Sequence, residues 1–190
     1  MYIDALIEKA IRLGASDAKR ISTREIIVEP ELVELCKPPR CKGYGQSANC
    51  PPHAMDPQDA QAMIHAHTWA LLFKVDLPPI RLLSKDHHRE FLRIFMIAGV
   101  LEQTARQLGL PSSYGLGAGS CKVVFCNNRP CAKLEGKPCL YPRLARPSLE
   151  AIGINVFKLA SLVHWPIHRI TRDSDPNEVP SAMLMGMVIL

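Results

Sequence analysis

The chain has 190 residues, 47% of them hydrophobic, which is enough to bury one sizeable core and predicts a single domain over residues 1–190. No run of about eighteen apolar residues occurs, so we expect no membrane span. The formal net charge is +5, but the lysines and arginines are spread along the chain and only 6% of residues are aromatic. This pattern permits an anionic small molecule or a weakly acidic partner and argues against nucleic-acid binding.

The first part of the chain predicts a helix followed by short strands. Apolar residues at helical spacing predict a helix over Ile3–Leu13, which Gly14 ends. Ala18–Ile21 and the β-branched segment Glu25–Val28 predict strands, and Glu31–Leu35 predicts one helical turn.

Two helices and a buried strand are predicted in the middle of the chain. Asp56, followed by a proline, predicts the N-cap of a helix that ends near Ala66. The nearly continuous apolar run Trp69–Val75 predicts a buried strand. Ser84 is predicted to cap the longest helix, Lys85–Leu108.

The last part of the chain predicts two more strands and one more helix. Ser113–Leu116 and Met183–Leu190 predict strands, and Ser148 is predicted to cap the helix between them. Because helices and strands alternate, we expect an α/β or α+β sandwich. It would contain one mixed sheet of about four or five strands, covered by helices, with two cysteine-rich metal-binding loops.

All seven cysteines fall in two segments rich in proline and glycine, which we name the first cysteine loop (residues 36–52) and the second cysteine loop (residues 117–147). The first loop contains Cys36, Cys41 and Cys50, and the second contains Cys121, Cys126, Cys131 and Cys139. A single cysteine is usually a small buried apolar residue. Four of them in one irregular loop indicate shared ligands, because a long loop without regular structure needs something to hold it.

Disulfides are the alternative to a metal. They need an oxidising compartment, and seven cysteines would leave one thiol unpaired. The N-terminal segment carries Asp4 and Glu8 inside its apolar pattern, unlike a secretion signal. We therefore predict a cytoplasmic protein with metal-bound thiolates.

The spacing of the cysteines favours an iron–sulfur cluster over zinc. Structural zinc sites usually contain close C-x2-C pairs, which are absent, although the four-residue intervals still reach the zinc range. Prolines adjoin Cys50, Cys131 and Cys139, as they often do at cluster ligands. We predict one or two 4Fe–4S clusters, with zinc as the alternative.

The first loop has three thiols and leaves one ligand position open. His53, a substrate or a thiolate of the second loop could fill it. Gly117 and Gly119 are predicted to let the backbone approach the cofactor. Arg143 and Arg146 are predicted to orient an anionic ligand, or else to balance the charge of the thiolates.

Three motifs together resemble a known family. They are C-x4-C-x2-Y-G-x4-C-P-P at Cys36–Pro52, G-x-G-x-C-x4-C-x4-C-x7-C at Gly117–Cys139 and R-P-S-x-E-A-x-G-I-x-V at Arg146–Val156. The chain is similar to an uncharacterised prokaryotic family of predicted metal-binding proteins. The resemblance implies that the seven cysteines bind metal, and it implies no reaction.

Two classes of function follow. The first is an iron–sulfur protein with a redox or electron-transfer role and a redox partner protein. The second is a non-catalytic zinc-binding accessory or structural module. Neither H-E-x-x-H nor G-x-S-x-G occurs, so no hydrolytic centre is predicted and no catalytic residue is assigned. The substrate, the oligomeric state and whether the protein is an enzyme stay open at this point.

Overall fold

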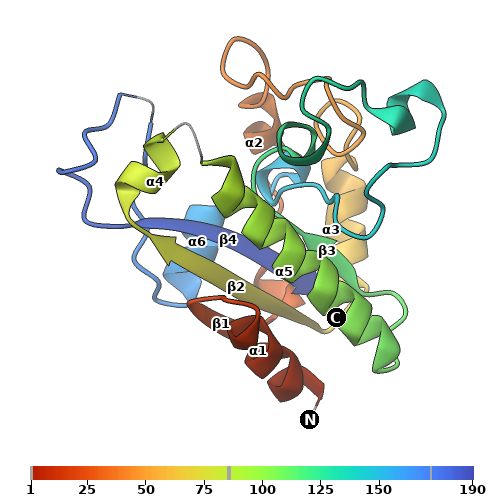
Figure 1. The fold of residues 1–190 in the computed structure, drawn as a ribbon. Coiled ribbons are helices and arrows are strands. Elements are labelled where there is room, and N and C mark those ends of the chain that lie inside the picture. Colours follow the sequence, from red (N-terminus) through yellow and green to blue (C-terminus); the bar gives the residue numbers. More distant parts are fainter. Residues whose placement is uncertain (1, 85–86, 172) are drawn as a thin grey trace.

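The computed structural model describes residues 2–84, 87–171 and 173–190, and at its centre is one antiparallel sheet (Figure 1). The strands are β1 (Asp17–Ser22), β2 (Trp69–Leu77), β3 (Tyr114–Leu116) and β4 (Ala182–Ile189). They lie in the order β1-β2-β4-β3, and each neighbouring pair is antiparallel. The single sheet covered by helices is confirmed, with four strands. The prediction of a mixed sheet is wrong.

The sheet is antiparallel because its last strand, β4, inserts between β2 and β3. β2 and β3 run in the same direction and are joined through the long helix α5 (His88–Gln107), yet β4 separates them. An alternation of helices and strands reveals such a crossover, but not the later strand that fills the gap. The error in the type of sheet therefore lay in the pairing of the strands.

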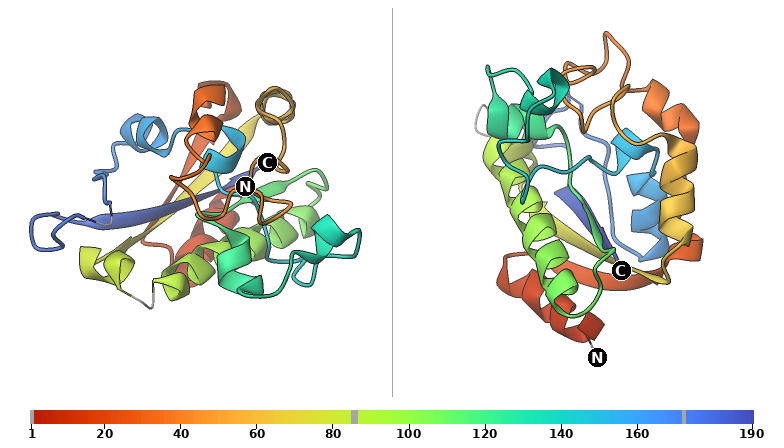
Figure 2. Two further views of the ribbon diagram at one scale, coloured as in Figure 1. Left: turned by 90° about the horizontal axis from the view of Figure 1, so that it is seen from above. Right: turned by 90° about the vertical axis from the view of Figure 1, so that its right-hand side faces the viewer.

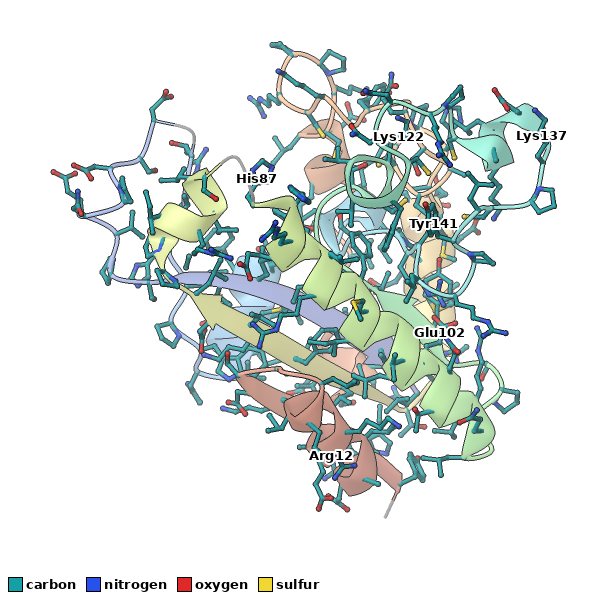
Figure 3. All side chains as sticks on the ribbon, viewed as in Figure 1. Arg12, His87, Glu102, Lys122, Lys137 and Tyr141 are labelled. Atoms are coloured by element: carbon teal, nitrogen blue, oxygen red, sulfur yellow. The ribbon has the colours of Figure 1, made fainter. Side chains whose placement is uncertain are left out.

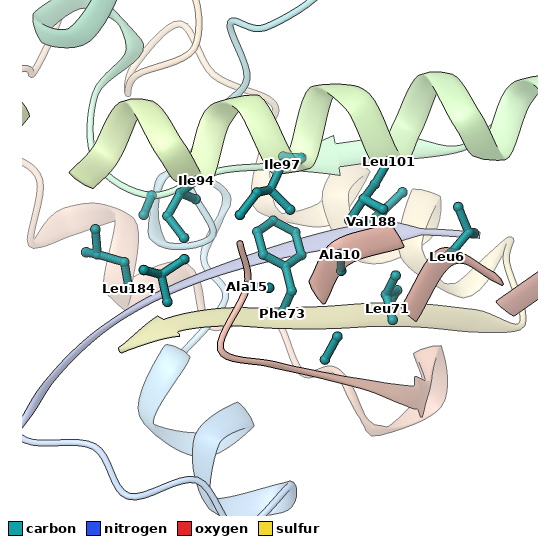
Figure 4. Close-up of a cluster of buried hydrophobic side chains, with 14 of the residues drawn as sticks. Leu6, Ala10, Ala15, Leu71, Phe73, Ile94, Ile97, Leu101, Leu184 and Val188 are labelled. Carbon is teal, nitrogen blue, oxygen red and sulfur yellow. The ribbon is translucent and has the colours of Figure 1, made fainter. Parts of the chain in front are cut away.

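Helices cover both faces of the sheet, as the views in Figure 2 show. α1 (Tyr2–Arg12) and α5 lie on one face, and α3 (Pro57–His65) and α6 (Val156–Leu162) lie on the other. The side chains of β2 alternate between the two resulting cores. Leu71 and Phe73 join the core beneath α1 and α5 (Figure 4), whereas Ala70 and Leu72 join the core of the other face. This double burial explains why β2 is nearly all apolar.

Two shorter helices, α2 (Pro30–Glu34) and α4 (Pro79–Leu83), complete the set of α-helices in the described residues. Within that part of the chain, no helix combines the length and the apolar character needed to cross a bilayer.

The predicted helix near the N-terminus is confirmed, and Gly14 ends it with a φ of 100° that glycine adopts readily. The helix predicted from Asp56 is also confirmed, because the Asp56 carboxylate accepts a hydrogen bond from the backbone N–H of Gln58 (2.8 Å). The end of α1 and the start of α3 were predictable because the residue that decides each of them lies next to the helix in the sequence.

The predicted strand Glu25–Val28 is wrong. The chain forms a 3-10 helix over Thr23–Glu25, since Ser22 and Glu25 form a reciprocal capping box. Val28 keeps one isolated antiparallel bridge. The local capping hydrogen bonds outweigh the β-propensity of the following residues.

The helix predicted from Ser148 begins later than expected, at Val156. Asn155 caps it by accepting hydrogen bonds from two backbone N–H groups of its first turn. The preceding 3-10 turn, Glu150–Ile152, ends at Gly153, whose φ of 88° turns the chain away.

Ser84 does not cap α5. Its hydroxyl donates to the carbonyl of Arg81 (2.8 Å), just after α4, and α5 begins at His88. Lys85, where that helix was predicted to start, lies outside the described residues.

The two cysteine loops lie side by side beyond the sheet edge formed by β3, near the first half of α5 (Figures 1 and 2). They are more than sixty residues apart in the sequence, so only the fold of the sheet and of α5 brings them together.

We expect Gly186→Ala to destabilise the protein by about 1–3 kcal/mol, as overpacking of a core does. Gly186 pairs with Phe73 across β4 and β2, and a Cβ at Gly186 would overlap the Phe73 ring. Denaturant unfolding measures the change.

Phe73→Leu provides the control for this clash. In the double variant the smaller side chain should reduce the cost of the alanine, since residues in contact are not additive. Additive costs of the two substitutions would contradict the proposed overlap.

Candidate metal centre

The second cysteine loop has almost no hydrophobic core of its own. Not one residue from 122 to 145 is buried, and its regular structure is limited to short helical turns at Lys122–Cys126 and Ala132–Glu135. The ring of Phe125 stacks on that of Tyr141 (5.1 Å between centroids) and contacts that of Phe95 on α5 (5.4 Å). These rings attach one side of the loop to α5 and leave the rest without apolar support.

A buried ion pair closes this loop at its base. Glu102 on α5, which is 2% exposed, accepts from the N–H of Gly115 (2.7 Å) just before the loop. It also accepts from the Arg146 guanidinium (2.6 and 2.9 Å) at the end of the loop. The Gly117 N–H donates to the Pro147 carbonyl (2.9 Å), so the two ends of the loop also meet directly. Figure 3 shows Glu102 on α5 below Tyr141 of the loop.

Arg146 and Arg143, predicted to orient an anion, differ in their surroundings. Arg146 is 8% exposed, and beyond Glu102 it donates to the carbonyls of Pro142 (3.0 Å) and Ala145 (2.9 Å). These contacts give Arg146 a structural role. The Arg143 side chain is exposed. Contact of either residue with an anionic ligand stays a prediction.

Gly117 and Gly119 lie against α5. A Cβ on Gly117 would stand 2.5 Å from the Phe95 ring, and one on Gly119 would stand 2.9 Å from the Phe91 ring. Gly119 also has a φ of 68°. Close packing on α5 therefore already requires both glycines, and their approach to a cofactor stays a prediction.

The first cysteine loop is a series of turns that begins after α2. The Cys36 N–H donates to the Val33 carbonyl (3.0 Å), which continues the last turn of α2. Farther on, the Gly45 N–H donates to the Pro51 carbonyl (2.7 Å). This bond closes the loop on itself, so that the chain after Cys41 returns beside Cys50.

Hydroxyl and amide groups link the two loops through their thiols. The Ser47 hydroxyl of the first loop lies 3.3 Å from the Cys121 sulfur, to which the Asn49 amide also donates (3.4 Å). In return, the Ser120 hydroxyl of the second loop lies 3.3 Å from the Cys50 sulfur. Each loop therefore supplies a polar partner to a buried thiol of the other.

The thiols of the first loop form one electrostatically linked set, which we name the three-thiol set. Burial is the main reason why the pKa of Cys50 is raised to about 11; the Ser120 hydroxyl lowers it, and the neighbouring Cys121, Cys41 and Cys36 add to the rise. Burial, with Cys41 and Glu150, likewise raises the pKa of Cys36 to about 11. Both thiols therefore hold their protons unless a metal replaces them.

The thiols of the second loop form a second linked set, the four-thiol set. Burial raises the pKa of Cys121, whose charge is also coupled to Cys131 and Cys139. Burial and the other three thiols raise the pKa of Cys126. Burial also acts to raise the pKa of Cys131, but backbone N–H groups and the Ser47 hydroxyl stabilise its thiolate, and the pKa is lowered. Cys131 is thus the thiol best prepared to ionise.

The fold gathers the seven thiols but does not preform a site for one ion. Across the described ranges, no three side chains of the His, Cys, Asp or Glu types are arranged to hold a single metal ion. His53 is exposed, and its role as a fourth ligand of the first loop stays a prediction. All seven cysteines are free thiols, which is the donor chemistry that thiolate-bound metals use.

Comparison with known proteins assigns the chain to a family. Residues 19–190 match the family DUF2284, described as predicted metal-binding protein. The chain belongs to this family. The match includes both cysteine loops and confirms the resemblance drawn from their motifs. No curated protein and no solved structure matches the chain.

Basic residues are concentrated on the two cysteine loops of this family member. The loops contain nine lysines and arginines and one acidic residue, a formal charge of +8 before any thiol ionises, compared with +5 for the whole chain. Arg129, Lys133 and Arg143 are exposed and form no ion pair with another residue of the described chain. Six of these basic residues are neighbours in the sequence of the second loop, and the fold brings the three of the first loop beside them.

Sequence reasoning missed the polar residues that organise the site. Ser120 and Asn49 each directly precede a cysteine, and that adjacency was the available signal. Glu102 had no such signal, because its partner Arg146 lies forty-four residues away.

We expect Glu102→Gln to destabilise the protein by about 3–5 kcal/mol, because it leaves the buried Arg146 cation without its counter-charge. Glu8→Gln is the matched control. It removes an exposed carboxylate that pairs with Arg12 at 3.5 Å, and should cost less than about 0.5 kcal/mol. Urea unfolding of both variants makes the comparison, and equal losses would contradict the anchoring role of Glu102.

In the metal-free reduced protein at about pH 8, iodoacetamide should modify Cys131 before Cys36 and Cys50. The thiolate is the reactive form, and the lowered pKa of Cys131 raises its thiolate fraction there. A pKa of about 11 keeps Cys36 and Cys50 protonated until the pH rises well above 9.

Peptide mass spectrometry over time measures this order. The control is the same reaction in denaturant, where the rates should converge. Alkylation of Cys50 as fast as Cys131 in the folded protein would contradict the assigned pKa directions.

Proposed function

We propose that this protein is an iron–sulfur protein with a redox or electron-transfer role. In this proposal the four-thiol set holds one 4Fe–4S cluster, and the three-thiol set holds a second one that keeps an open position. The observation that carries the proposal is the presence of two thiol sets, of four and of three, in loops whose thiols share polar partners.

The need for a metal is supported by the state of the second loop. Its residues 122–145 include none that is buried, so hydrophobic burial cannot hold the thiols in place. Ligation of four thiolates would order this segment, because metal-binding free energy becomes folding free energy in such loops.

A redox role is supported by the unequal number of thiols. A structural site is normally closed by four protein ligands, whereas three ligands leave a position for a substrate. A cluster would supply one-electron chemistry, with a potential set by its charge, hydrogen bonds and exposure. Ser47, Asn49 and Ser120 contact thiol sulfurs and would tune that potential.

The surroundings support an anionic or acidic partner. Arg129, Lys133 and Arg143, which form no ion pair with another described residue, belong to the loop of the four-thiol set, three of whose thiols are partly exposed. An acidic redox protein or an anionic small molecule would be attracted to this surface, and more strongly at low salt.

A zinc-binding structural module is the second candidate. It is favoured by the same lack of buried residues in the second loop, since a zinc tetrathiolate would hold that loop equally well. Under this alternative the metal only orders the loops and the basic surface binds a partner.

Anaerobic purification followed by metal analysis and an absorption spectrum tests the proposal. We expect a brown protein with about four or eight irons per chain whose visible band is bleached by dithionite. A colourless protein with about one or two zinc ions would refute the redox role.

Two serine variants then separate the thiol sets. Cys41→Ser should leave a stable fold and the iron of the four-thiol set. Cys131→Ser should disorder the second loop, which limited proteolysis detects. His53→Ala is the control and should retain all of the iron if histidine is not a ligand. A Cys41→Ser protein that fails to fold would remove the first loop as a working site.

A further inference from the structure

A small cavity lies between the two helical layers, beside the three-thiol set. Its volume is about 290 Å³. Phe91 of α5, Val156 of α6, and Met183 and Met185 of β4 supply much of its apolar wall. Glu150 is the one ionisable residue in the lining, as far as the described ranges show. The cavity is therefore apolar on most sides and acidic at one point.

Two parts of the cavity lining lie close to the three-thiol set. Gly119 lines the cavity, and the next residue, Ser120, places its hydroxyl 3.3 Å from the Cys50 sulfur. On the other side, Glu150 lies close enough to Cys36 for the two groups to interact electrostatically. A molecule in the cavity would lie next to the set that has a ligand position open.

No cation neutralises Glu150 within the described part of the chain. The ion pairs found there do not include it. Burial raises the pKa of Glu150, and only the Ser148 hydroxyl and its own backbone N–H act to lower it. Because a half-buried carboxylate without a counter-charge is poorly stabilised, a cation entering the cavity would gain a favourable partner.

We propose that this cavity binds a small, mainly apolar amine in its ammonium form, with Glu150 as the counter-ion. The assignment as the substrate site of the first loop rests on the proposed function. The Phe91 ring adds an aromatic wall that ammonium groups favour. The thiols of the three-thiol set, once a metal has replaced their protons, would disfavour an anion. The volume is at the low end of small-molecule sites, about 300–1,000 Å³, so the ligand is smaller than a typical drug.

Calorimetric titration of the full-length protein, purified anaerobically with its metal, tests this inference. The probes are cyclohexylammonium, cyclohexanol and cyclohexanecarboxylate, which share one ring and differ in charge. We expect the ammonium to bind tightest and the carboxylate weakest. Glu150→Gln should weaken the ammonium at least about tenfold, a loss of about 1.4 kcal/mol, with little change for the alcohol.

Two further variants control the measurement. Glu135→Gln removes an exposed carboxylate that pairs with Lys137 outside the cavity, and should leave all three affinities unchanged. Val156→Trp places a larger side chain in the cavity wall without replacing a thiol, and should abolish binding of every probe. Thermal unfolding shows whether the Glu150→Gln variant folds. If it does not, the Val156→Trp variant still tests the site.

Equal binding of the ammonium and the carboxylate, or unchanged ammonium affinity in Glu150→Gln, overturns the inference. Iron content and the visible spectrum of the same samples separate it from the proposed function. A colourless zinc protein that still prefers the ammonium through Glu150 refutes the redox role and keeps the binding site. An iron-loaded protein without that preference refutes the amine-binding site and keeps the proposed function.

Discussion

The second cysteine loop depends on Glu102, because this one carboxylate holds both of its ends. It accepts from the Gly115 N–H before the loop and from Arg146 at its end, and it is 2% exposed. In a dry site such charge-assisted bonds are strong as long as every partner is present. The base of the loop is therefore rigid, while its tip contains no buried residue. The four-thiol set lies in a segment that is fixed at the base and needs a second constraint farther out.

In the proposed function, metal-bound thiols would provide that second constraint, and the two loops would share it. Ser47 and Asn49 contact Cys121, while Ser120 contacts Cys50, so ordering one thiol set positions polar groups of the other. Burial raises the pKa of Cys50 and Cys121, so a metal must displace protons that the thiols hold firmly. Under the proposed function, metal loading of either loop would therefore depend on pH, and the direct contacts would link it to the order of the other loop.

The sequence predicted correctly those features that depend on residues close together in the chain. Gly14 ends α1, Asp56 caps α3, and the apolar run of β2 marks a strand with both faces covered. The prediction of a mixed sheet failed because of contacts between residues far apart in the sequence. β4 enters the sheet between β2 and β3 after more than a hundred further residues, and no local pattern encodes that pairing.

The site follows the same division. The grouping of the seven cysteines into two loops is visible as spacing, and the family match agrees with it. The partner of Arg146 was not visible, and neither was the concentration of nine basic residues on one end of the molecule, because each depends on the fold. Glu25–Val28 failed for a different reason, since a local capping box replaced the strand that its β-branched residues predicted.

The two thiol sets have opposite surroundings, and this contrast bears on how they would work together. The four-thiol set lies in an exposed loop with unpaired basic side chains, which suits exchange with a partner in solution. The three-thiol set contains the buried Cys50 and borders a small apolar cavity with one carboxylate, which suits a small molecule kept away from water. Cys50 and Cys121 interact electrostatically, so charge on one set is felt by the other. This asymmetry is not needed to order the loops, and it agrees with the proposed function, in which electrons would pass from the exposed set to a molecule bound beside the buried one.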